Sequence, residues 1–284
     1  MSDAGLAARI AAVLGSAPQR QRALSGGCVS PVLRVDLADG RAVVAKVGDP
    51  GGGLELEARM LAALGGAGWP VPAVLHAARD LLLLAFVDSD GSAGAAAEAR
   101  AAELLAARHG EAQPAFGFEG DTVIAGLPQA NPRSARWIPF FAEHRLLAMA
   151  AQARAAGRLP AGLETRIERL AGRLERWLLE PPHPSLIHGD LWGGNILFRR
   201  GEVAAVIDPA CYWADAEIEL AFTTLFHTFG DAFFRRYRAL RPLADGFFEE
   251  RCELYNLYPL LVHVCLFGGS YVGAVERTLR RYGV

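Results

Sequence analysis

Cysteine is scarce in this chain of 284 residues, and its four cysteines are widely spaced: Cys28, Cys211, Cys252 and Cys265. None of them forms the C-x-x-C pair that is typical of zinc sites and dithiol redox motifs. The pattern therefore argues against a structural zinc site and against a disulfide framework. It is compatible with a reducing compartment, so we expect a cytoplasmic protein.

Long apolar runs and excess charge are also missing. No stretch approaches the ~20 apolar residues that a membrane-spanning helix needs, and the densest run, 81–87, has the length of a strand. Arg9 interrupts the first apolar segment, which favours a helix over 6–14 rather than a signal peptide. The net charge of −2 provides no basic field for nucleic acid or an anionic membrane. We therefore expect neither kind of partner.

What the chain does contain is a substantial core, since 52% of its residues are hydrophobic, and its length suits one large domain or two lobes. The N-terminal pattern predicts a β-hairpin from strands 32–37 and 41–47, followed by a helix over 54–64. Further helices are predicted over three ranges, namely 95–108, 137–151 and 164–179.

The segment 186–198 carries the most informative motif. A polar, glycine-rich loop lies between apolar residues that predict short buried strands, and it brings Asp190 and Asn195 close together. A second apolar strand then ends at Asp208. In protein kinases, an Asp accepts the proton of the substrate hydroxyl, an Asn five positions later holds magnesium, and a later Asp holds the metal that bridges the phosphates. The less specific alternative is an Asp-Gly hairpin followed by a capped strand.

A lysine on the predicted hairpin supplies another part of such a site. Lys46 has apolar neighbours on both sides, and its ammonium group cannot be buried without an anionic partner. Glu57 lies beside the apolar face of helix 54–64, so we assign it as the partner of Lys46, with Glu55 as the alternative. This pattern favours a phosphate-binding lysine over a solvated strand lysine.

Two further segments are expected to contact a nucleotide. The loop before the hairpin contains Gly27 and Ser30 and would cover the phosphates. The apolar pattern ends at 88–92, where we expect the hinge between two lobes. In a kinase-like fold the adenine would bond to backbone groups around Ala85, Phe86 and Val87.

Taken together, these motifs resemble the fructosamine kinase (ketosamine-3-kinase) family over about Ser25 to Tyr271. The most specific pieces are Gly26–Ser30, Gly126–Asn131, Trp137–Leu146, His188–Asn195 and Leu266–Tyr271. The Trp192 that follows Asp190-Leu191 separates the chain from the related aminoglycoside and choline phosphotransferases, which share only the His-Gly-Asp and Asn pattern.

The resemblance implies a two-lobed, protein-kinase-like α+β fold. A small N-terminal nucleotide-binding lobe, 1–88, would contain an antiparallel sheet and a helix, and a larger, mainly helical lobe, 89–284, would hold the catalytic and substrate-binding residues. Family members use ATP and magnesium to phosphorylate the 3-hydroxyl of a sugar attached to an amine, which makes the adduct labile and removes it from proteins or free amino acids.

The resemblance also implies a role for each candidate residue. Asp190 would be the general base, and Asn195 and Asp208 would bind magnesium. Lys46 would bind the nucleotide phosphates with Glu57 as its partner, and Trp192 would lie at the sugar pocket.

Some features of the sequence leave substrate and assembly open. The family usually has Asp where Glu219 stands, Gly where Ala214 stands, and an acidic residue where Ala85 stands. The alternative functions are a phosphotransferase for another small hydroxyl compound, such as an amino sugar or aminoglycoside, and a nucleotide-binding pseudoenzyme. The sequence is compatible with a monomer or a homodimer.

Cys28 prompts a separate hypothesis because it lies in the predicted phosphate loop. An exposed thiol near Lys46 and loop amides would have a lowered pKa and would oxidise readily. A disulfide between two such loops would link two copies and hold both loops away from ATP. The alternative is a partly shielded thiol without a role.

Overall fold

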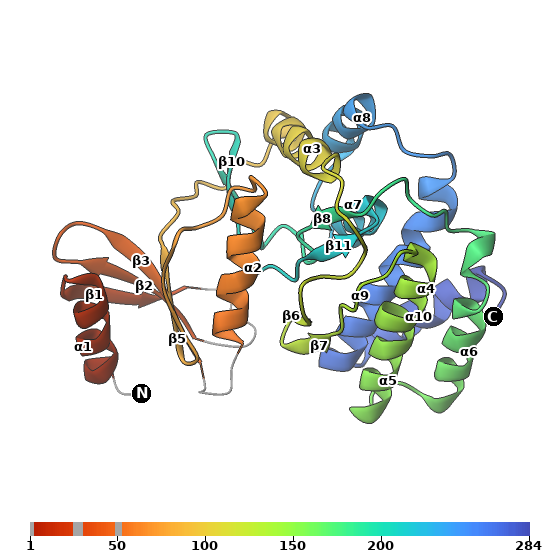
Figure 1. Ribbon diagram of the computed structural model, residues 1–284, viewed down its shortest axis with the longest axis horizontal. Helices are drawn as coiled ribbons and strands as arrows, with labels where there is room; N and C mark the ends of the chain where they lie inside the picture. The colour runs from red at the N-terminus through yellow and green to blue at the C-terminus, as the bar shows by residue number, and fades with distance from the viewer. Residues whose placement is uncertain (1–2, 25–30, 49–52) are drawn as a thin grey trace. The chain divides into compact units, whose positions relative to one another are not determined.

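The computed structural model describes residues 3–24, 31–48 and 53–284, which fall into two units (Figure 1). The first unit comprises residues 1–97 and 194–209, and the second comprises residues 98–193 and 210–284. The predicted loop residues Gly27, Cys28 and Ser30 lie outside the described residues.

The first unit is built on a five-stranded antiparallel sheet with the strand order β1-β2-β3-β5-β4. Its elements are α1 (Asp3–Leu14), β1 (Pro18–Ala23), β2 (Val32–Leu37), β3 (Ala42–Val47), α2 (Leu54–Gly66), β4 (Val74–Ala78) and β5 (Leu81–Ala85). Strand β5 is buried on both faces. Leu81 and Leu83 belong to the core cluster that contains α1, whereas Leu82 and Leu84 pack with α2. The period-two alternation of a strand thus explains why its apolar run is continuous.

A hairpin from later in the chain also belongs to the first unit. It consists of β9 (Ile196–Arg199) and β10 (Glu202–Val206), which pair antiparallel. The amide of Val206 donates to the carbonyl of Pro70 at 2.7 Å, and the amide of Asp90 donates to the carbonyl of Phe198 at 3.0 Å. Because of these bonds the segment 194–209 joins the first unit, a feature that a single division after residue 88 does not include.

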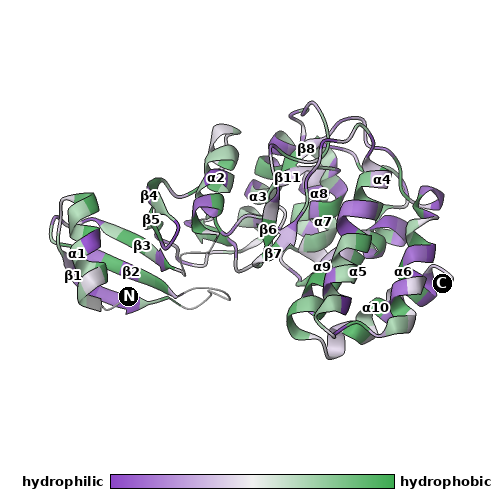
Figure 2. Cartoon of the chain, turned by 60° about the horizontal axis from the view of Figure 1, so that its bottom comes forward, coloured by the Kyte–Doolittle hydropathy of each residue, from purple (hydrophilic) through white to green (hydrophobic). Residues whose placement is uncertain are grey.

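The second unit is mainly helical. Its elements are α3 (Ala95–His109), β6 (Thr122–Ile124), β7 (Leu127–Gln129), α4 (Trp137–Phe141), a π-helical segment (Ala142–Leu147), α5 (Ala148–Ala155), α6 (Ala161–Ala171), a 3₁₀ turn (Leu174–Arg176), β8 (Ser185–Ile187), β11 (Tyr212–Ala214), α7 (Ala216–Leu225), α8 (Asp231–Leu240), a second π-helical segment (Phe247–Arg251), α9 (Cys252–Phe267) and α10 (Ser270–Arg281). Helix α9 is hydrophobic along much of its length and packs against α5, α7 and α10 (Figure 2).

The structure confirms several sequence-based elements and corrects others. The helix at 6–14, the hairpin at 32–47 and the helices at 54–64 and 95–108 are present. Strand β1 was not predicted, because its sequence is polar and its pairing with β2 at the sheet edge defines it. The helix predicted over 137–151 is interrupted by the π-helical segment, and the helix predicted over 164–179 ends at Ala171. Among the described residues, no helix combines the length and apolar character needed to cross a membrane.

Candidate active site

Lys46 is the centre of a buried ion-pair cluster in the first unit. Its Nζ atom lies 2.6 Å from Oε1 of Glu57 and also contacts Oδ1 of Asp208. Only 10% of the Lys46 side chain is exposed. Burial opposes the charge of Lys46, but the carboxylates of Glu57 and Asp208 outweigh this effect and raise its pKa. Burial also raises the pKa of Glu57, despite the ammonium group beside it. The cluster therefore holds one ammonium between two carboxyl groups.

The local structure explains how these three side chains meet. Lys46 stands in the middle of the sheet, opposite Val32 of β2 and Leu82 of β5. Glu57 lies in the first turn of α2, where its amide donates to the carbonyl of Gly53 at 2.8 Å. Glu57, rather than the alternative Glu55, makes the contact with Lys46.

Asp208 follows β10 in an uncommon backbone conformation. Its φ is +54°, in the left-handed region that non-glycine residues seldom adopt. The preceding amide, that of Ile207, donates to the carbonyl of Asn195 at 3.0 Å. Asn195 and Asp208 are therefore joined through the backbone within the same unit. Strained backbone of this kind is concentrated at functional sites, which makes Asp208 a candidate for function.

The oxygen atoms of Asn195 and Asp208 are chemically suited to magnesium. Asn195 is buried, whereas 34% of the Asp208 side chain is exposed, so part of its carboxylate is accessible. Magnesium prefers oxygen ligands and is commonly bound by one or two carboxylates together with substrate phosphates. In the part of the chain that the structure describes, no three His, Cys, Asp or Glu side chains form a metal-binding group. A site of the magnesium–phosphate type does not require such a group.

The predicted adenine-contact segment lies at the end of β5. The amide of Ala85 donates to the carbonyl of Ala73 at 2.9 Å, and the amide of Phe86 donates to the carbonyl of Ala42 at 3.1 Å. The guanidinium of Arg34 lies over the Phe86 ring, 4.1 Å from its centroid. Because two amides already donate within the sheet, adenine would have to use carbonyl oxygens of this segment or the backbone of Val87.

In the second unit, Asp190 follows a short strand whose pairing fixes the start of its loop. Strand β8 pairs with β11, and the pairing continues where the amide of Ala210 donates to the carbonyl of His188 at 2.9 Å. The His188 side chain is buried, and its Nδ1 atom lies 3.3 Å from the amide of Asp190. The side chain of Asp190 therefore projects from a backbone that is held from within the core.

Gly189 is required by the geometry of this loop. Its φ is +83°, and a Cβ atom at this position would lie 2.3 Å from the carbonyl oxygen of Ala210. Only glycine avoids both the steric overlap and the unfavourable φ. The amide of Gly189 donates to Oε1 of Glu219 on α7 at 2.8 Å.

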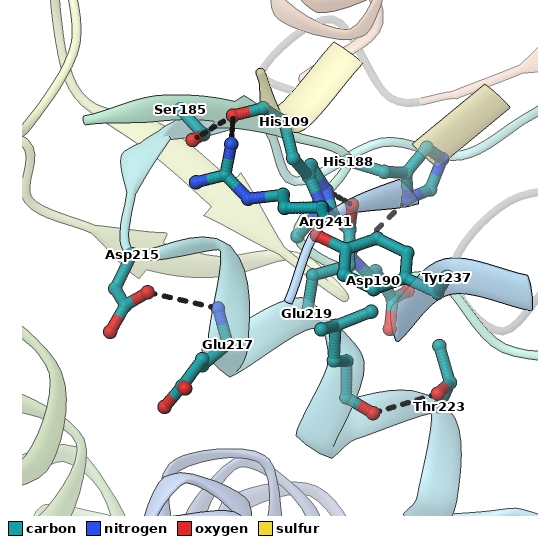
Figure 3. Close-up of polar contacts among 12 residues, drawn as sticks. His109, Ser185, His188, Asp190, Asp215, Glu217, Glu219, Thr223, Tyr237 and Arg241 are labelled. Carbon is teal, nitrogen blue, oxygen red and sulfur yellow. Dashed lines mark hydrogen bonds and ion pairs between the residues drawn. The ribbon is translucent and has the colours of Figure 1, made fainter. Parts of the chain in front are cut away.

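The structure adds residues that the sequence analysis did not assign to the site. Oε2 of Glu219 lies 2.9 Å from Nε2 of His109, and Nδ1 of His109 lies 2.9 Å from the hydroxyl of Tyr237 (Figure 3). All three side chains are buried. In the sequence, Glu219 was noted only because it stands where the family usually has Asp. His109 and Glu219 are 110 positions apart, so no local sequence pattern indicates that they are in contact.

Trp192 lies on the surface of the second unit. It is 39% exposed, and its ring makes an edge-to-face contact with Phe226, with the centroids 6.2 Å apart. A tryptophan that fills the core would be buried, so the exposure of Trp192 favours a contact surface for a ligand.

The candidate residues form two groups according to the unit in which they lie. Lys46, Glu57, Asn195 and Asp208 belong to the first unit, and Asp190 and Trp192 belong to the second.

Comparison with known proteins places these residues in a family context. The model of the family described as fructosamine kinase matches residues 4–283. A probable ketoamine kinase from Synechocystis is 40% identical over 189 residues, which are 64% of this chain and 61% of that protein. The matched part thus spans about three fifths of that relative's length.

Solved structures support the same fold. A structure assigned as a fructosamine-3-kinase from Thermobifida fusca has a TM-score of 0.88 and 33% identity, and the match covers 98% of each chain. An aminoglycoside phosphotransferase solved with AMP-PNP and hygromycin B has a TM-score of 0.69 at 17% identity, over 98% of this chain and 99% of that one. At this identity the likeness concerns the fold alone. The predicted protein-kinase-like α+β fold is confirmed.

The ion-pair cluster leads to a prediction for Lys46→Met. The methionine fills a similar volume but leaves Glu57 without its cation, so we expect a loss of stability on the order of 1–3 kcal/mol. If Lys46 binds the nucleotide phosphates as predicted, turnover with ATP should fall much further, because that ligand is removed. Chemical unfolding and a coupled ADP assay on the same samples measure the two effects.

The double variant Lys46→Met/Glu57→Gln separates stability from activity. It removes the more buried of the two carboxylates that lose their cation and should regain part of the stability without regaining turnover. Arg41→Met, which breaks an exposed ion pair with Asp39, is the surface control and should resemble wild type. Wild-type turnover in Lys46→Met would contradict a role of Lys46 in phosphate binding.

Proposed function

Because this chain belongs to the fructosamine kinase family, we propose that it transfers the terminal phosphoryl group of ATP to the 3-hydroxyl of a ketosamine. The observation that carries this proposal is the family match over residues 4–283, together with the ion-pair cluster of Lys46, Glu57 and Asp208. A nucleotide-binding pseudoenzyme would not require all the catalytic positions, and every one of them is filled in this sequence.

The first unit would bind the nucleotide. The ammonium of Lys46 is held by Glu57 and can contact phosphate oxygens, as the corresponding lysine does in protein kinases. The loop with Gly27 and Ser30 would cover the phosphates, and Ala85, Phe86 and Val87 would border the adenine. Asn195 and Asp208 would hold Mg²⁺, which when bound neutralises charge that develops on the phosphates.

The second unit would supply the base and the acceptor site. Asp190 would accept the proton of the 3-hydroxyl while the hydroxyl oxygen forms a bond to the γ-phosphorus of ATP. The bond between the γ-phosphorus and the bridging oxygen breaks, and ADP leaves with that oxygen. The partly exposed position of Asp190 suits this role, since the base must reach a hydroxyl of a bound substrate.

The exposed ring of Trp192 supports a ketosamine as the acceptor. Trp192 lies two residues after the proposed base, so a substrate at Asp190 is within reach of an indole face. A sugar ring can pack on this face, and the positively charged secondary amine of a ketosamine is attracted by it. We propose that the substrate is a small-molecule or protein-bound ketosamine, that the enzyme acts in the cytoplasm, and that it does so as a monomer or homodimer.

A panel of acceptors tests this function directly. ADP formation is measured with fructosyl-lysine, ribulosyl-lysine and an aminoglycoside at equal concentrations, each with and without Mg²⁺. We expect magnesium-dependent turnover with at least one of the two ketosamines and little with the aminoglycoside. Turnover with the aminoglycoside alone would replace the proposal with the second phosphotransferase function.

Trp192→Ala tests the acceptor site. Because the indole face would be lost while the nucleotide residues remain, we expect the KM for the ketosamine to rise about tenfold with little change in the KM for ATP. Steady-state kinetics with each substrate varied in turn provides the measurement. A lower thermal stability with both KM values unchanged would instead assign Trp192 a packing role.

A further inference from the structure

The segment Leu266–Tyr271 has no part in the proposed chemistry, although it is among the most specific motifs of the sequence. It joins α9 to α10 and exposes Phe267, which is 59% accessible. This is the largest exposed fraction among the large hydrophobic side chains in the described part of the chain. A single exposed apolar residue is common on protein surfaces, so its neighbours decide whether it has a function.

Phe267 belongs to a connected row of aromatic rings that ends at Trp192. The ring of Trp192 contacts that of Phe226, and the ring of Phe226 contacts that of His263 at a centroid distance of 5.1 Å. The ring of His263 also contacts those of Tyr271, at 4.8 Å, and Phe267, at 5.8 Å. We call these five side chains the aromatic row. All five are exposed or half-buried, and all belong to the second unit.

The aromatic row presents an uncharged surface. The only ring in it that can become a cation near neutral pH is that of His263. Its Nδ1 atom donates to the carbonyl of Pro259 at 2.7 Å, and burial lowers the pKa of His263, which favours the neutral imidazole. The row can therefore cover apolar groups of a ligand without burying an unpaired charge.

The backbone at the far end of the row fixes the exposed position of Phe267. Gly268 and Gly269 have φ values of +62° and +57° and ψ values of −136° and −127°. Residues with a Cβ atom avoid this combination, which glycine adopts readily. Nη1 of Arg158 donates to the carbonyl of Cys265 at 2.7 Å and holds the last turn of α9. The exposure of Phe267 is thus a defined feature of the fold.

The near end of the row lies at the proposed acceptor site. Trp192 follows the proposed base, Asp190, by two residues. Helix α9 is close to the same base. Burial raises the pKa of Tyr258, five residues before His263 on α9, and the charge of Asp190 contributes to this rise. Because electrostatic interactions weaken with distance, this part of α9 lies near Asp190. A ketosamine with its sugar at Asp190 could therefore extend the group on its amine along the row.

We propose that the aromatic row is a subsite for the carrier of the ketosamine, that is, the molecule whose amine bears the sugar, and that it favours carriers with an apolar group next to this amine. The side chain of a glycated lysine, with its methylene groups, has this character. The row identifies this occupant because it is uncharged and continues from Trp192, the side chain that would contact the sugar. The inference rests on the proposed function, which places the sugar at Asp190.

Three substrates that share the fructose group but differ in the carrier test this subsite. The fructose adducts of methylamine, hexylamine and glycine provide a minimal, an apolar and a carboxylate-bearing carrier. In wild type, we expect kcat/KM for the hexylamine adduct to exceed that for the methylamine adduct at least about tenfold, since the burial of two methylene groups has an effect of this size. The glycine adduct should show no such gain.

Substitutions of two exposed phenylalanines locate the subsite. In Phe267→Ser, we expect the gain with hexylamine to fall to about threefold or less, while kcat/KM for the methylamine adduct and the KM for ATP change less than twofold. Phe267→Leu keeps an apolar side chain and should retain most of the gain. Phe248→Ser is the matched control. Phe248 is 41% exposed, but its ring contacts Phe234 and Phe247 and not the row, so this variant should retain the full gain.

Binding in the absence of turnover provides a second readout. The 3-deoxyfructose adducts of methylamine and hexylamine lack the acceptor hydroxyl and can be titrated by calorimetry without ATP. We expect the hexylamine analogue to bind wild type about tenfold more tightly and with a more negative heat-capacity change, which marks the burial of apolar surface. Both differences should be much smaller in Phe267→Ser.

The possible results separate this inference from the proposed function. Equal kcat/KM for the methylamine and hexylamine adducts in wild type would overturn the subsite and leave the proposed function intact, as would a gain that Phe267→Ser retains or that Phe248→Ser loses equally. If light scattering showed that Phe267→Ser dissociates a dimer without changing the gain, the row would be a subunit interface and the inference would fail. If wild type phosphorylated no ketosamine, the proposed function would fail, and the titrations alone would decide whether the row binds an apolar carrier.

Discussion

The buried charge of Lys46 is the constraint on which the first unit depends. An ammonium group inside a sheet is costly unless carboxylates surround it, and the two that do so come from distant parts of the sequence. Glu57 is provided by α2, which packs on the sheet through its apolar face. Asp208 is provided by the segment after β10, which requires the β9–β10 hairpin to join the first unit. One ammonium thus stands beside two carboxyl groups, and this arrangement is compatible with the proposed binding of a divalent cation at Asp208.

A second constraint governs the loop of Asp190. There, backbone packing and a buried carboxylate act on one residue, Gly189, which has no side chain and a left-handed φ. The chain passes from the second unit to the first at 193–194, within the motif that contains both Asp190 and Asn195. The motif therefore supplies each unit with one of the candidate residues, and the backbone of each is held by hydrogen bonds within its own unit.

The sequence predicted those parts of the fold that depend on local patterns. Alternating apolar residues indicated the hairpin around Lys46, and helical periodicity distinguished Glu57 from Glu55. Strand β1 could not be predicted because its polar sequence forms a strand only through its pairing with β2.

Polar contacts between residues far apart in the sequence could not be predicted either, because they too depend on the folded structure and not on a local pattern. The bond between Glu219 and His109 joins residues 110 positions apart, and neither residue type indicates the other as its partner. The left-handed φ of Asp208 was likewise unexpected, because a strand pattern that ends in a carboxylate does not report the backbone conformation of its last residue. The nucleotide role of Gly27 and Ser30 and the redox hypothesis for Cys28 concern residues outside the described part of the chain and stay predictions.

The central claim is that Asp190 takes the proton of a ketosamine hydroxyl while other residues bind the nucleotide. The most direct measurement compares Asp190→Asn with wild type in magnesium-dependent turnover of a ketosamine and in ATP affinity by titration. The account predicts a loss of turnover of ~10²–10⁴-fold or more with nearly unchanged ATP affinity, because a general base contributes to the reaction and not to nucleotide binding. Turnover at the wild-type rate in Asp190→Asn would contradict it.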